Sequence, residues 1–392
     1  MISVERPRCG VENGQFMVSS RIHVKNDRSY DIYYRSSQGP VSSGDETFFA
    51  ATLIPAMQEG GPLHLDGSVS KRLFRGAARI QEIYRVWDPG LHGVRTDVRT
   101  GGGLGNGAAR GVGCFFSGGV DSFYTFLKHR EEITHLVFVH GFDLKLADTA
   151  LRAEAACAIR GISREFGKQL IEVDTNLRDF SERFAHWGTH YHGSALASVA
   201  LLLAPQLGKI YIPASNTYLH LHPRGSHPLV DPRWSTEGME IDHDGCEATR
   251  FGKIERIIGS EIVLKTLRVC WENLGGTYNC GRCEKCVRTM IPLSMLGVLN
   301  RCTTFRSRFS IAKLRKLDMS EGTVKYVKED LEAARRLGIK SVLTRCLALW
   351  LGFYYARRGG LALWRAMKQV LKWGLRSLHL WRPEVKSHVP TH

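Results

Sequence analysis

The six residues from Ser117 to Ser122 read SGGVDS, and their composition is typical of an anion-binding turn. Gly118 and Gly119 have no Cβ, so a phosphate could approach their backbone N–H groups closely. Asp121 would repel a phosphate unless a divalent cation lay between them, and Mg²⁺ carried by ATP meets that need. Asp121 and Ser117 are therefore the candidate catalytic residues. The residues expected to bind ATP and Mg²⁺ are Ser117, Gly118, Gly119, Val120, Asp121 and Ser122.

Four cysteines within residues 270–286 form a second candidate site. They are separated by nine, two and two residues, and this spacing can close a tetrahedral Cys₄ site for Zn²⁺. Gly281 would permit the sharp turn between two of the ligands. A redox C-x-x-C pair and an iron–sulfur cluster remain open as alternatives. The predicted zinc ligands are Cys270, Cys280, Cys283 and Cys286.

The elements that must position these residues alternate between strand and helix after residue 112. The predicted strands are continuous apolar runs, as expected where helices cover both faces of a parallel sheet. We therefore expect an α/β fold with a doubly wound parallel sheet, in which SGGVDS joins the first strand to the first helix and ligands bind at the carboxyl ends of the strands. The predicted strands are 112–116, 135–142, 170–174 and 209–215, and the helices between them are 121–132, 151–167 and 193–208.

SGGVDS resembles the PP-loop, S-G-G-x-D-S, of the adenine nucleotide alpha-hydrolase-like ATP pyrophosphatases. The commoner nucleotide loop, G-x-x-x-x-G-K-[ST], is absent from the chain. With the cysteine knuckle, residues 112–300 are similar to the 7-cyano-7-deazaguanine synthase family of the queuosine pathway. The knuckle departs from that family by one extra residue between its first two cysteines, and the family lacks the N-terminal hundred residues and the basic tail.

The resemblance implies an ATP-dependent enzyme, of the carbon–nitrogen ligase or synthase type, that converts ATP to AMP and pyrophosphate. It would activate a small-molecule carboxylate or amide for attack by ammonia or an amine. The SGGVDS residues would hold the pyrophosphate and its magnesium, and the four cysteines would hold zinc. Two alternatives stay open: an RNA base thiolation enzyme, and a non-catalytic ATP- and zinc-binding subunit of a larger assembly.

The long, proline-punctuated stretch after the fourth strand, residues 212–245, is the expected place for the acceptor. Ser215 and Asn216 are predicted to face the nucleotide. His227, Asp231 and Trp234 are predicted to shape the acceptor pocket. The alternative is a rigid surface loop held by side-chain turns.

The first hundred residues read as short strands, 16–24 and 30–35, followed by one helix, 70–87. They predict an N-terminal α+β accessory domain, 1–100. The glycine-rich residues 101–111 predict a linker before the domain 112–300.

The C-terminal region, 301–392, is strongly basic, with 20 Lys and Arg against 6 Asp and Glu, whereas 111–300 hold 20 against 21. Residues 341–381 read as two amphipathic helices broken at Gly359–Gly360, with tryptophans at 350, 364, 373 and 381. Such helices suit an acidic partner, an anionic membrane surface or a cap on the enzyme. The nearly neutral N-terminal domain disfavours nucleic acid. Charges in the first residues argue against a signal peptide, so the sequence predicts a cytoplasmic protein whose tail could associate with a membrane.

Overall fold

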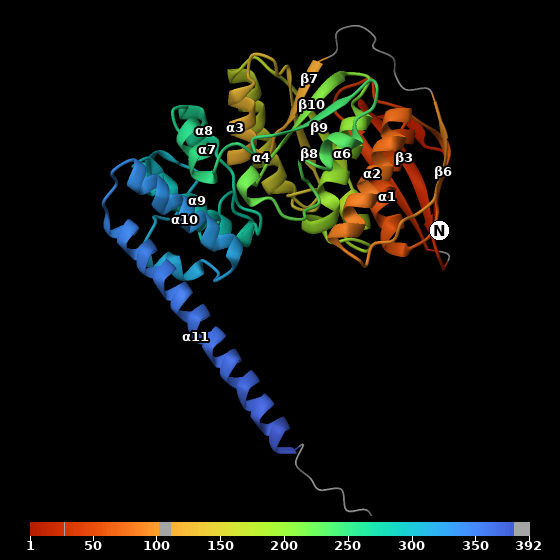
Figure 1. Cartoon of the computed structure of the whole chain (residues 1–392). Coiled ribbons are helices and arrows are strands. Elements are labelled where there is room, and N and C mark those ends of the chain that lie inside the picture. The colour runs from red at the N-terminus through yellow and green to blue at the C-terminus, as the bar shows by residue number, and fades with distance from the viewer. Residues whose placement is uncertain (27, 102–110, 380–392) are drawn as a thin grey trace, which may run out of the picture. The chain divides into compact units, whose positions relative to one another are not determined.

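The computed structural model describes residues 1–26, 28–101 and 111–379, with side chains up to residue 360. The chain divides after Lys316 into two compact units, Met1–Lys316 and Leu317–His392 (Figure 1). The predicted linker, 101–111, lies almost wholly outside the described residues.

The first unit is built on one large sheet. Its strands follow the order β11-β10-β7-β8-β9-β4-β3-β1-β5-β6, and β2 pairs with β3. The five strands from β11 to β9 are parallel to one another. The predicted parallel α/β sheet is therefore confirmed. These strands are β7 (Gly111–Phe115), β8 (His135–His140), β9 (Gln169–Thr175), β10 (Leu207–Pro213) and β11 (Glu240–Asp244).

Alternate residues of the parallel strands point to opposite faces of the sheet and enter different cores. Helices therefore cover both faces of the sheet. On β8, Val137 belongs to one core, and Leu136 and Phe138 belong to the other. The first core holds α6 (His192–Leu202), and the second holds α3 (Val120–Lys128) and α4 (Thr149–Glu165). The remaining helices of this half are α5 (Leu177–Ser181), α7 (Arg250–Ile257), α8 (Glu261–Thr266) and α9 (Glu284–Met295).

Strand β11 corrects one expectation, because residues 240–244 had been assigned to an irregular stretch. The strand reads EIDHD, which has a single apolar side chain, Ile241. It pairs only with β10 in the sheet. An edge strand needs few apolar residues, so its sequence carries little strand signal.

The N-terminal strands continue the same sheet. β4 pairs antiparallel with β9, and Tyr34 lies opposite Thr175. One core runs through both parts and includes Phe48 as well as Leu201. Residues 1–100 and the parallel half thus share one sheet and one core. The N-terminal strands are β1 (Ile2–Val4), β2 (Arg8–Glu12), β3 (Gln15–Val24), β4 (Arg28–Ser36), β5 (Leu63–Val69) and β6 (Thr96–Thr100).

The expectation of a single N-terminal helix was wrong. The helix α2 (Lys71–Trp87) was predicted, but α1 (Asp45–Glu59) was not. Eleven consecutive residues of α1, from Thr47 to Met57, are buried. A helix buried on all sides shows no apolar stripe, so its periodic signal is lost.

The C-terminal unit consists mainly of α10 (Glu321–Arg336) and α11 (Val342–His379). The expected break at Gly359–Gly360 is absent, because α11 is one helix of 38 residues. Each glycine costs a helix only about 1 kcal/mol relative to alanine, which helix formers on both sides can offset. Among the described residues, no helix is both long and apolar enough to cross a bilayer. The side chains of Trp364 and Trp373, and all of Trp381, lie outside the described part.

Candidate functional site

The SGGVDS loop lies where β7 ends and α3 begins. Gly119 is the N-cap residue of α3, and Gly118 has φ +73°, a left-handed conformation that favours glycine. The Arg268 backbone N–H donates to the Gly118 carbonyl at 2.9 Å. An added Cβ on Gly118 would meet no atom closer than 3.9 Å. The loop is therefore fixed by the Arg268 backbone and leads directly into a helix N-terminus.

Two side chains of the motif turn inward. Val120 belongs to a hydrophobic core, so only its backbone is available to a ligand. Ser122 is buried, and its hydroxyl donates to the Gly119 carbonyl at 3.0 Å. The hydroxyl of Ser122 thus stabilises the first turn of α3. Ser117 is only half-buried.

Asp121 lies between two cations from α7. The Arg250 Nη1 is 2.7 Å from one carboxylate oxygen, and the Lys253 Nζ is 3.4 Å from the other. Burial alone would raise the pKa of Asp121, but the charges of Arg250, Lys253 and Lys285 lower it to about 2. The carboxylate is therefore ionised at neutral pH and held in place by the helix that packs on α3.

Ser215 belongs to the same site. It lies two residues after the end of β10, and its Oγ lies 3.5 Å from the Asp121 carboxylate. Lys253 donates to the neighbouring Ala214 carbonyl at 2.5 Å. The structure thus brings the end of β10 to the SGGVDS loop, because β10 and β7 are adjacent parallel strands. Asn216 is the next residue and is half-buried.

Further charged groups surround this loop. Lys285 interacts electrostatically with Asp121, Asp143 and Arg250, and burial is the main reason that its pKa is lowered. Burial raises the pKa of Asp143, but Lys285 and His192 lower it, and the net shift is downward. The surface of Asp143 is nevertheless exposed. Asp121 and Asp143 therefore share the field of Lys285 beside the loop.

Arg268, beside the loop, is a buried cation with 4% exposure. Its Nη2 donates to Asn273 at 2.7 Å, whereas its Nε has no hydrogen-bond partner within the described ranges. A buried guanidinium with an unused donor is costly unless an anion or water completes it. The surroundings of the loop therefore have the electrostatics of an anion site.

The three residues predicted to shape the acceptor pocket are buried. Asp231 and Trp234 are fully buried. Asp231 accepts hydrogen bonds from Ser226 and His243, both at 2.7 Å. The His227 ring packs edge-on against Trp87, with ring centroids 4.8 Å apart. These contacts favour a role in holding the loop, and acceptor contact by His227, Asp231 and Trp234 stays a prediction.

The four predicted zinc ligands come together as a metal-binding cluster. Their sulfur atoms all lie within 4.8 Å of one another, and all four residues are buried. The Sγ–Sγ distances are 3.9 Å for Cys270–Cys283 and 3.9 Å for Cys280–Cys286. Zn–S bonds of about 2.3 Å in a tetrahedron require sulfur atoms about 3.8 Å apart. The cluster is thus positioned to bind a metal such as zinc.

Backbone donors support the cluster as thiolates. The N–H groups of Cys283 and Cys286 donate to the sulfurs of Cys280 and Cys283, at 3.2 and 3.4 Å. Hydrogen bonds from neighbouring thiols lower the pKa of Cys270. The hydrogen bond to Cys270, together with burial and the charge on Cys270, raises the pKa of Cys283 to about 12. One thiol therefore ionises readily, but its charge opposes ionisation of the others. A divalent cation removes that conflict.

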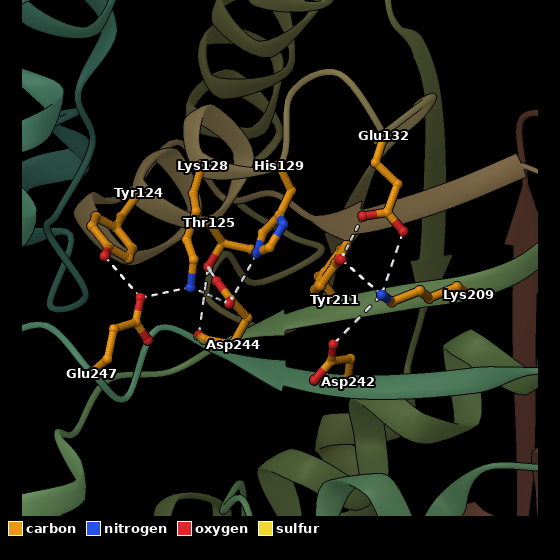
Figure 2. Close-up of polar contacts among 10 residues, drawn as sticks. All are labelled: Tyr124, Thr125, Lys128, His129, Glu132, Lys209, Tyr211, Asp242, Asp244 and Glu247. Carbon is orange, nitrogen blue, oxygen red and sulfur yellow. Dashed lines mark hydrogen bonds and ion pairs between the residues drawn. The ribbon is translucent and has the colours of Figure 1, made fainter.

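A polar network fixes the C-terminal end of α3 (Figure 2). Asp244, at the end of β11, accepts from Lys128 at 2.7 Å, Thr125 at 2.9 Å and His129 at 3.0 Å. Glu247 adds a 2.6 Å contact to Lys128. A second group joins Lys209 and Tyr211 of the neighbouring strand β10 to Glu132, which follows α3 (Figure 2). The helix that begins at the SGGVDS loop is thereby fastened at its far end to the sheet.

The comparisons with known proteins are negative. No family model matches the chain, and neither a curated protein nor a solved structure does.

Sequence reasoning missed the cations and Asp143. Arg250 and Lys253 stand three apart on α7, so they share one helix face. That spacing was the available signal, but nothing in it indicates which carboxylate the face would meet. The residues around the loop that sequence reasoning missed are Asp143, Arg250, Lys253, Arg268 and Lys285.

Proposed function

We propose that this protein is an ATP-dependent adenylating enzyme that releases AMP and pyrophosphate while activating a carboxylate or amide for attack by ammonia or an amine. One observation carries the proposal. A glycine loop at a helix N-terminus lies beside Asp121, Arg250 and Lys253, at the carboxyl end of parallel strands. This combination is suited to a polyphosphate.

The chain's own groups have separate roles in this proposal. The N–H groups around Gly118 and Gly119 bind the outer phosphates. The cations around the loop stabilise the charge that develops as the AMP group is transferred. Arg250 and Lys253 also hold Asp121 ionised, which fits that carboxylate to face a cation. Mg²⁺, when bound with ATP, would neutralise phosphate charge. Ser215 lies close enough to Asp121 to help orient the same ligand.

The test is product analysis with Mg-ATP, a panel of carboxylic acids and ammonia. AMP and pyrophosphate are the expected products. ADP and phosphate would refute adenylation. Asp121→Asn should abolish turnover. Asp66 is an exposed acid outside the candidate site, so Asp66→Asn should leave turnover unchanged.

The same assay separates the alternatives. ATP that binds but is recovered intact, with every acceptor tested, would identify a non-catalytic binding subunit. Iron in an anaerobically prepared sample, together with tRNA binding, would identify a thiolation enzyme.

A further inference from the structure

We propose that the C-terminal helix α11 binds the surface of anionic membranes, with an apolar stripe entering the bilayer interface and cations on both edges of the stripe contacting lipid phosphates. The helix is one uninterrupted element of 38 residues, about 57 Å long (Figure 1). The proposed reaction does not depend on this role, because the residues of the candidate site belong to the first compact unit and α11 to the second.

The apolar stripe consists of three large side chains that face solvent. Val342, Leu349 and Phe353 are 63%, 74% and 60% exposed. They are separated by seven and four residues, so they share one face of the helix. The sequence after residue 360 keeps apolar residues at the same helical spacing, namely Trp364, Met367, Leu371 and Leu378.

A different face of α11 packs inside the C-terminal unit. Leu347 and Tyr354 are buried. Arg358, which follows Tyr354 by one turn, pairs with Glu321 of α10 at 2.7 Å. By helical spacing these three residues lie well away from the stripe. The stripe is therefore distinct from the face that holds α11 to α10.

The charge of α11 favours an anionic partner. Between Val342 and His379 the sequence has seven Lys and Arg residues and no Asp or Glu. Arg345 and Arg357 are exposed, and each lies about 60° around the helix from Val342, on opposite sides. Cations thus border the stripe on both edges. Long basic side chains in such positions can reach lipid phosphates while the apolar residues enter the interface.

Length and charge favour a membrane over a protein partner. A bilayer offers a continuous anionic surface along the whole helix, where each Lys or Arg gains favourable energy. Pairing with a second copy of α11 would bring two sets of seven cations together with no acid between them, which disfavours a coiled coil. A helix with an apolar stripe and this many cations lies in the plane of the interface.

The experiment is a flotation assay with the full chain and vesicles of phosphatidylcholine, with or without phosphatidylserine as about a third of the lipid. Binding should require phosphatidylserine and weaken steeply between about 0.1 and 1 M salt. The double variant Arg345→Gln/Arg357→Gln should bind about 30-fold more weakly, as expected for two cations near the surface. Arg75→Gln, at an exposed arginine of α2, is the control and should bind like the parent protein.

The stripe has its own variant, Leu349→Gln/Phe353→Gln. It should bind anionic vesicles about 100-fold more weakly, because two apolar side chains no longer enter the interface. Its thermal midpoint should match that of the parent protein, since both side chains are exposed. Val86→Gln is the matched control, because Val86 is an apolar residue of α2 with 83% exposure.

Three results would overturn the proposal. One is equal binding to vesicles with and without phosphatidylserine, and another is unchanged binding in either double variant. The third is a parent protein that does not bind the vesicles but binds polyglutamate or duplex DNA, or self-associates in sedimentation. That result would assign the stripe to a different partner.

Discussion

Replacement of Asp121 by asparagine probes the centre of the candidate site. The substitution keeps the shape of the side chain and removes its charge. Arg250, at 2.7 Å, and Lys253, at 3.4 Å, would then be buried without their counter-ion. The side chains of Arg250 and Lys253 are only 7% and 2% exposed, so water cannot replace the carboxylate.

The magnitude follows from the pKa. The carboxyl group shifts from its ordinary value of 3.8 to about 2 in the folded protein. A shift of that size corresponds to about 2.5 kcal/mol of favourable interaction with the ionised form. Breaking a buried ion pair by removing one partner costs about 3–5 kcal/mol. We therefore expect Asp121→Asn to lower the free energy of unfolding by about 3 kcal/mol at pH 7.

The direction of the pKa shift determines how the stability changes with pH. A depressed pKa contributes stability that is present above pH 3.8 and is lost as the pH falls through about 2. The difference between the parent protein and Asp121→Asn should therefore be constant from pH 8 to pH 5. It should shrink only below about pH 4.

The assay is urea denaturation, with Arg250→Met and the double variant completing a thermodynamic cycle. We expect a coupling energy of about 1–3 kcal/mol between Asp121 and Arg250. A loss below about 0.5 kcal/mol, or additive single effects, would refute the reasoning. Binding of metal-free pyrophosphate should survive in Asp121→Asn, because the N–H groups of the SGGVDS loop remain, whereas turnover of Mg-ATP should not.

Three further predictions concern the loop, the metal centre and a buried histidine. Gly118→Ala should cost about 1 kcal/mol, because alanine disfavours φ +73°, and should weaken ATP binding in titration calorimetry. Cys280→Ser should lower metal content by mass spectrometry and lower the thermal midpoint, whereas Cys157→Ser, an exposed cysteine, should change neither. Burial alone would lower the pKa of His243, but Asp231 and Cys246 raise it to about 9. The stability contributed by His243 is therefore complete below about pH 6.5 and lost as the pH rises through 9, by at most about 3 kcal/mol in urea denaturation. Constant stability over that range, or an equal decline in His243→Gln, would contradict this assignment.

Local residue types were enough to predict four of the five parallel strands, the turn into α3 and the cysteine cluster. Continuous apolar runs mark strands covered on both faces, and the two glycines mark a tight turn after the first of them. The cysteines were predictable because metal ligands close in sequence need little help from the rest of the fold. The proposed chemistry comes from the same short segments.

Only the tertiary structure determined which residues and strands contact one another across long sequence separations. Asp121 and Arg250 are 129 residues apart, and only the packing of α7 on α3 brings them to 2.7 Å. Residues 1–100 share a sheet with the parallel half because β4 pairs with β9, a contact that no local pattern announces. Spacing and periodicity report on neighbours along the chain. The charges around the SGGVDS loop come from residues that are distant in sequence. They become neighbours in space only once the sheet has assembled.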